Sequence, residues 1–183
     1  MKLLRYLISI IFCNIYRILR IFPNNDPIMG FMLPYARKDK WWQALIFPLV
    51  AIISFDILTN KVGVWTIGTA VSYGVLAIFF QNIFRKIKTM SLKKYAASSI
   101  FGVLFFDFVT GPIMSSMLFK ISFESAFIGQ IPFTIMHLAS ATAFTLLVVP
   151  ILDPQITKSV KMSFTSYLNR AKLMIAIVSG GKL

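Results

Sequence analysis

The chain has 183 residues, of which 57% are hydrophobic and 14% are charged. Soluble domains carry about a quarter charged residues, so a soluble core of this size would leave much apolar surface in water, whereas a lipid bilayer covers it. The formal net charge of +13 is divided among segments between long apolar runs, which favours the cationic loops of a membrane protein and argues against a nucleic-acid partner.

The first apolar segment covers residues 3–22 and follows a basic start at Lys2 and Arg5. Arg17 and Arg20 stand near its end, where a cleavable signal peptide has small residues. We therefore expect a first helix that is retained in the mature protein.

A loop at residues 23–27 and a short apolar segment at residues 28–37 come next. Two prolines and three Asx residues mark the loop. The apolar segment is short for a hydrocarbon core of about 30 Å. It either crosses the membrane as a short second span or forms a half-helix that pairs with its neighbours.

Four longer apolar segments follow, at residues 41–58, 64–84, 95–112 and 124–150. The first of them would be about 27 Å long as a helix, and all four are long enough to span a bilayer. We expect Pro132 to bend the last span without ending it. Residues 113–123 are predicted to form a hairpin loop before it.

The C-terminal segment, residues 153–183, differs because its charges are spread along its whole length. Its apolar residues repeat at helical spacings, a pattern typical of a basic amphipathic helix on a membrane surface. The sequence therefore predicts an all-α integral membrane protein. Residues 1–152 are expected to form a compact bundle of about six transmembrane helices, the second one short, and residues 153–183 a cytoplasmic, interfacial amphipathic tail.

The basic residues also predict an orientation. With six spans and the N-terminus inside, 15 of the 19 Lys and Arg residues lie on the inner side, most densely between residues 85 and 94. Asp26, Asp56, Asp107 and Glu124 fall at the outer ends of the spans. The positive-inside rule then places both termini in the cytoplasm and the chain in the cell membrane as a multi-pass protein.

A short repeat stands at the outer ends of two predicted spans. Residues 55–60 read Phe-Asp-Ile-Leu-Thr-Asn, and residues 106–111 read Phe-Asp-Phe-Val-Thr-Gly. Each copy places a carboxylate and a hydroxyl within one helical turn, and transport folds often bind solutes where such repeats meet.

Buried carboxylates at these places need partners, because an unpaired charge within a membrane is costly. One interpretation is a structural clasp in which Arg17 and Arg20 pair with Asp56 and Asp107. The other is a polar pocket beneath the outer surface that binds a small solute.

Gln130, Thr134 and His137 share one face of the last predicted span, because they are four and three residues apart. This face should point into the bundle, where polar groups find partners. His137 is either a hydrogen-bonded packing residue or a solute ligand. One histidine without a nearby cysteine offers too few ligands for zinc, so no metal site is expected.

The loops add further polar candidates. Asn24, Asn25 and Asp26 are turn-forming residues, helix caps or parts of a lid over the pocket, and Trp65 is an interface anchor or a stacking surface. The predicted substrate-binding residues are Arg17, Arg20, Asn24, Asn25, Asp56, Thr59, Asn60, Trp65, Asp107, Thr110, Gln130, Thr134 and His137.

Patterns for catalysis are missing from the sequence. It contains no G-x-S-x-G, no H-E-x-x-H and no phosphate-binding P-loop. We therefore expect no enzyme and no cofactor, although His137 and the two repeat aspartates would be the candidates for a membrane-embedded enzyme. Active transport would draw on a gradient or on a partner.

Several motifs resemble the S components of energy-coupling factor transporters, in particular an uncharacterised S-component-like family. They are Phe22-Pro23-Asn24-Asn25-Asp26-Pro27, Pro48-Leu49 with Ser54-x-Asp56, Phe105-Phe106-x-x-x-Thr110, and Ile131-Pro132-Phe133. The resemblance covers roughly residues 15–150.

This resemblance implies a protein that binds a vitamin or another small metabolite from outside, in a pocket near the outer surface. It also implies docking on a membrane coupling subunit with two ATPases. The alternative from the sequence is a non-transporting membrane scaffold or assembly protein, suggested by the basic segment 85–94 and the basic tail.

Overall fold

The computed structural model describes residues 2–21, 24 and 26–178 and contains no strand within them. The fold is all-α, as predicted. The helices in chain order are α1 (Lys2–Leu19), α2 (Ile28–Lys38), α3 (Trp41–Leu58), α4 (Val64–Lys86), α5 (Leu92–Phe108), the π-helical turn η1 (Val109–Ile113), α6 (Met114–Phe119), α7 (Phe123–Leu152) and α8 (Pro154–Val178).

Four helical stretches among the described residues are long and apolar enough to cross a membrane. They are α3, α4, the continuous stretch Leu92–Phe119 and α7. Large apolar side chains such as Ile67, Phe101 and Ile135 stand exposed on them. Because so much apolar surface suits lipid rather than water, these helices support an integral membrane protein.

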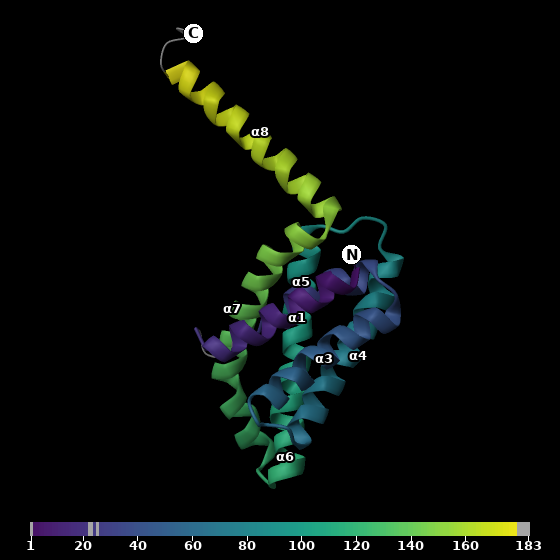
Figure 1. Cartoon of the computed structure of the whole chain (residues 1–183). Helices are drawn as coiled ribbons and strands as arrows, with labels where there is room; N and C mark the ends of the chain where they lie inside the picture. The colour runs from purple at the N-terminus through teal and green to yellow at the C-terminus, as the bar shows by residue number, and fades with distance from the viewer. Residues whose placement is uncertain (1, 22–23, 25, 179–183) are drawn as a thin grey trace.

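The predicted number of six spans is wrong by this measure. α1 has 18 residues but carries basic residues at both ends, among them Arg5 and Arg17. α2 has 11 residues, which is too short to cross a hydrocarbon core of about 30 Å. α1 also lies obliquely across the bundle rather than along it (Figure 1).

α2 forms the centre of the packed core. All its residues from Ile28 to Ala36 are buried, and it packs against α3, α4, α5 and α7. Gly30 permits the close approach to α7, because a Cβ there would lie 2.9 Å from the carbonyl carbon of Phe144. The apolar character of this segment therefore reflects burial among helices, which is the half-helix interpretation of the sequence.

The predicted hairpin loop at residues 113–123 is also wrong for most of its length. The chain passes from α5 through η1 into α6, which ends at Phe119. Pro112 lies inside the π-helical turn, where an altered hydrogen-bonding pattern accommodates a residue without an N–H. Lys120, with φ of 54°, then ends the helix in the left-handed conformation.

α8 extends away from the bundle (Figure 1). Ile156, near its start, is buried, whereas Val160 and Met174 further along are exposed. The predicted tail is thus one helix from Pro154 to Val178, and it begins directly after α7 ends at Leu152.

Candidate functional site

A cavity of about 810 Å³ opens at the end of the bundle where α1 and α3 end and α4 begins. Helices that are distant in sequence contribute to its wall, since α1, α3, α4, α5, η1 and α7 all supply side chains. The lining residues are Arg17, Arg20, Asn24, Asp26, Ile28, Ile52, Phe55, Asp56, Lys61, Trp65, Thr69, Tyr73, Phe106, Asp107, Thr110, Gln130, Phe133 and His137.

Most of the predicted site residues meet in this cavity: Arg17, Arg20, Asn24, Asp56, Trp65, Asp107, Thr110, Gln130 and His137. Thr134 instead lines a second, mostly apolar cavity of about 420 Å³ between α5 and α7, whose wall also includes Asp107 and Gln130. Thr59 and Asn60 do not line the main cavity, and Asn25 lies outside the described residues.

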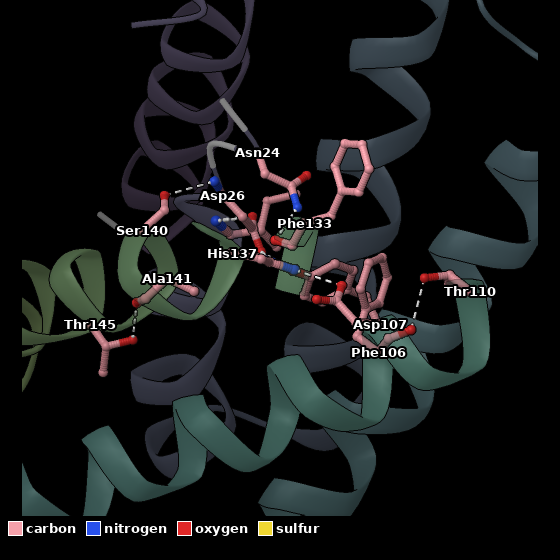
Figure 2. A network of polar contacts seen from close by, with 12 residues as sticks. Asn24, Asp26, Phe106, Asp107, Thr110, Phe133, His137, Ser140, Ala141 and Thr145 are labelled. Carbon is pink, nitrogen blue, oxygen red and sulfur yellow. Dashed lines mark hydrogen bonds and ion pairs between the residues drawn. The ribbon is translucent and has the colours of Figure 1, made fainter. Parts of the chain in front are cut away.

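The centre of the site is a buried triad of Asp26, His137 and Asp107 (Figure 2). His137 Nδ1 lies 2.8 Å from Asp107 Oδ1, and His137 Nε2 lies 3.0 Å from Asp26 Oδ2. The Tyr73 hydroxyl donates to the same oxygen of Asp26. The ring of Phe106 packs edge-on against the imidazole, 5.7 Å between centroids.

Asp26 is the residue that the sequence-based list of the site omits. Its Oδ1 accepts a hydrogen bond of 2.8 Å from the Ile28 amide at the start of α2, and its own amide donates to the Ser140 hydroxyl on α7. From sequence alone, an Asx residue before a helix indicates an ordinary helix cap. The usable signal was its place two residues before the buried apolar run at residues 28–36, which draws the carboxylate inward.

The predicted Asp–Arg clasp does not form. Asp56 accepts a 2.6 Å hydrogen bond from the Thr66 hydroxyl, and Asp107 pairs with His137. Among the described residues neither Arg17 nor Arg20 forms an ion pair. The Arg17 guanidinium instead lies 3.9 Å from the centroid of the Phe55 ring. The two arginines line the same cavity as Asp56 and Asp107 without pairing with them.

Two buried polar atoms of the site have no hydrogen-bond partner within the described part of the chain. They are Nη1 of Arg17, a donor, and Oδ2 of Asp107, an acceptor. Leaving such atoms unpaired costs roughly 1–3 kcal/mol each. Native proteins rarely retain this cost without a ligand, ion or ordered water at the site.

The two copies of the repeat begin alike and then diverge. Thr59 and Thr110 each donate to the carbonyl four residues earlier, at 2.9 and 2.8 Å. Within the first copy α3 ends at Leu58, and Asn60, the last residue of that copy, adopts a φ of 54°. Within the second, Gly111 continues as π-helix, and a Cβ there would lie 2.6 Å from the Gln130 side chain. The glycine thus makes room for Gln130 at the cavity wall.

Aromatic rings supply much of the remaining wall. Phe55, Trp65, Tyr73, Phe106 and Phe133 all line the cavity. Tyr73 and Phe106 lie 4.4 Å apart between centroids. The Asn24 amide donates to the Phe133 carbonyl at 2.7 Å and so closes the α1–α2 loop against α7 (Figure 2).

The described residues contain no group of His, Cys, Asp or Glu side chains arranged to hold a metal ion. His137 stands between the two carboxylates, so they do not converge on a common point. Comparison with known protein families, curated proteins and solved structures found no match. The chemistry of the cavity itself therefore carries the functional inference.

Proposed function

We propose that this protein is a membrane-embedded component that binds a small solute and takes part in its transport. The observation that carries the proposal is a cavity lined by both Arg17 and Asp107, whose buried Nη1 and Oδ2 atoms have no hydrogen-bond partner among the described residues. Ligand pockets typically have volumes of about 300–1,000 Å³ and combine apolar walls with a few well-placed polar groups. The cavity fits this description in size, and its wall is richer in polar and charged groups.

The wall defines what kind of solute would bind. The Arg17 donor suits a carboxylate, phosphate or carbonyl oxygen, and the Asp107 acceptor suits an N–H or O–H group. The aromatic rings between them suit an apolar or planar body. We therefore propose a small metabolite with an acceptor at one end and a donor at the other.

The charges support an orientation. α3 ends and α4 begins at the cavity, whereas the basic segment between α4 and α5 and the start of α8 lie at the opposite end. With the basic end in the cytoplasm, the cavity faces the outside of a cell membrane. This arrangement matches the uptake role that the resemblance to S components implies, with a coupling subunit and ATPases as the energising partner.

Binding is testable on the purified protein. Thermal unfolding in mild detergent, measured against a panel of vitamins, nucleobases and amino acids, should show a rise in the unfolding temperature for a narrow set of related compounds. Asp107→Asn should abolish that rise, whereas Glu124→Gln, which changes an exposed acid outside the cavity, should preserve it. No response to any compound, together with unchanged uptake in a deletion strain, would contradict the proposal.

The alternative is a scaffold or assembly protein without transport. The observation that favours it is α8, which extends from the bundle with exposed side chains. Affinity purification of the full chain in mild detergent separates the two. A stable partner unrelated to ATPases would favour the scaffold, and a coupling subunit with ATPases would favour solute transport.

A further inference from the structure

The two hydrogen bonds of the Asp26–His137–Asp107 triad require one proton more than a neutral histidine and two ionised aspartates carry. Both ring nitrogens of His137 lie within hydrogen-bond distance of a carboxylate oxygen, at 2.8 and 3.0 Å (Figure 2). A neutral imidazole has one N–H and therefore donates to one carboxylate only. For both contacts to be hydrogen bonds, a second proton must lie on the ring or on one of the carboxyl groups.

Tyr73 does not supply this proton. Its hydroxyl already donates to Oδ2 of Asp26, the oxygen that faces His137. The Ile28 amide occupies Oδ1. Asp26 is therefore hydrogen-bonded as an ionised acceptor. A second proton on the imidazole lets the ring donate to both Asp26 and Asp107 in charge-assisted hydrogen bonds.

Charged groups on every neighbouring element bear on this proton. Asp107 on α5 and Asp26 before α2 contact the ring, and Tyr73 on α4 contacts Asp26. The wall of the same cavity adds cations from the end of α1 and from the α3–α4 loop, and an acid from α3. The thiol of Cys13 on α1 is buried. The cavity groups in question are Arg17, Arg20, Lys61 and Asp56.

We propose that a proton is a second ligand of this protein, held on His137 between Asp26 and Asp107 and exchanged with the cavity. The link to solute rests on the proposed function. Asp107 offers Oδ1 to the imidazolium and leaves Oδ2 unpaired. A solute that brings a cationic N–H group to Oδ2 places a second positive charge beside the ring. The ring proton then leaves through the cavity to water, so that one cation enters as one proton departs.

The protonation state of His137 is directly observable because it is the single histidine of the sequence. The full chain, labelled with ¹⁵N-histidine and purified without a histidine tag, gives one ring in an NMR spectrum. At about pH 7, above the usual titration of an exposed histidine, both nitrogens should be protonated. A neutral ring with one protonated nitrogen would overturn the proposal, whatever the outcome of the solute screen.

Variants of the two acids at the cavity wall locate the proton. Asp107→Asn should weaken proton binding to His137 by at least about tenfold, because it removes a contacting negative charge. Asp56→Asn is the matched control, since Asp56 lines the same cavity but bonds to Thr66 instead of His137. Equal effects of the two substitutions would contradict a proton held by the triad.

Ethylammonium chloride, compared with sodium chloride at the same ionic strength, tests the exchange. We expect it to weaken proton binding by about tenfold in the wild type and to have no effect in Asp107→Asn. A wild-type ring that is protonated but insensitive to ethylammonium would overturn the coupling. A protonated, sensitive ring with a flat solute screen would instead leave the proton site standing and reject the proposed function.

Discussion

The two ends of the bundle use the same residue types in opposite ways. At the end away from the cavity, Asp39 lies 2.5 Å from Arg5 and accepts from the Tyr6 hydroxyl. Asp153 lies 2.8 Å from Lys38 and accepts from the Tyr95 hydroxyl. We call these four charged residues the paired end. At the cavity end, Asp26 and Asp107 share His137, and Arg17 forms no ion pair among the described residues.

The polar groups of the paired end hold helices together, whereas those of the cavity end remain available to bind a ligand. The paired end joins α1 to the end of α2, and α2 to the junction of α7 and α8, with a cation for each carboxylate. A carboxylate whose desolvation is compensated by a cation and a hydroxyl supports a defined packing. The cavity end instead leaves a donor and an acceptor unmatched, at a cost in stability that a bound solute would offset.

The largest effect is expected from Lys38→Met at the paired end. Asp153 is fully buried, and without Lys38 its charge loses its compensation. The free energy of unfolding should fall by about 3 kcal/mol, with solute affinity unchanged. Detergent-induced unfolding measures the loss. Lys86→Met, an exposed lysine at the end of α4, is the control, and an equal loss there would show that the pair is not structural.

Arg17→Met should have the opposite effect to Lys38→Met: it should lower solute affinity and leave stability nearly unchanged. We expect the affinity for a solute found in the panel to fall by about 10- to 100-fold, because one charge-assisted hydrogen bond is lost. Stability should change by less than about 1 kcal/mol, since loss of the contact with Phe55 is balanced by removal of an unpaired buried donor. Calorimetric titration and unfolding report the two quantities, with the exposed Arg85→Met as control. A large loss of stability would make Arg17 structural after all.

Gly111→Ala tests the cavity wall where η1 packs against α7. The new Cβ meets the Gln130 side chain at 2.6 Å, so Gln130 must move into the cavity, and stability should fall by about 1–2 kcal/mol. Gly129→Ala on α7 meets no atom within 4 Å and should be neutral or slightly stabilising. Thermal unfolding compares them, and identical behaviour would mean that the close contact is absent.

The smallest effect concerns acid pH. Burial raises the pKa of Asp153, but hydrogen bonds from Lys38 and Tyr95 and the charge of Lys38 outweigh it, so that the pKa lies below its ordinary value. A lowered pKa in the folded state contributes stability above the ordinary value, which is lost as pH falls through the folded value. We expect this contribution to stability to be lost as the pH falls below about 4. In Lys38→Met this part of the pH dependence should disappear.

Much of the fold was predictable because apolar runs and turn residues act locally. Residues 41–58 form α3 with the predicted bounds, and the tail is one helix. The six-span count failed because an apolar segment reads alike whether lipid or other helices bury it, as α2 shows. The helical stretch before α7 was predicted as a loop because Gly111 and Pro112 signal a break, while a π-helical turn carries the chain through them.

The sequence by itself determined where polar residues lie along their helices, since hydropathy and spacing place Asp56 and Asp107 near the ends of α3 and α5 and His137 in the middle of α7. Only the tertiary structure decided their partners. Pairing depends on how each helix is rotated and how closely it approaches its neighbours, and a shift of one residue turns a side chain by about 100°. That rotation directs His137 to Asp26 and Asp107 and leaves Arg17 facing the cavity.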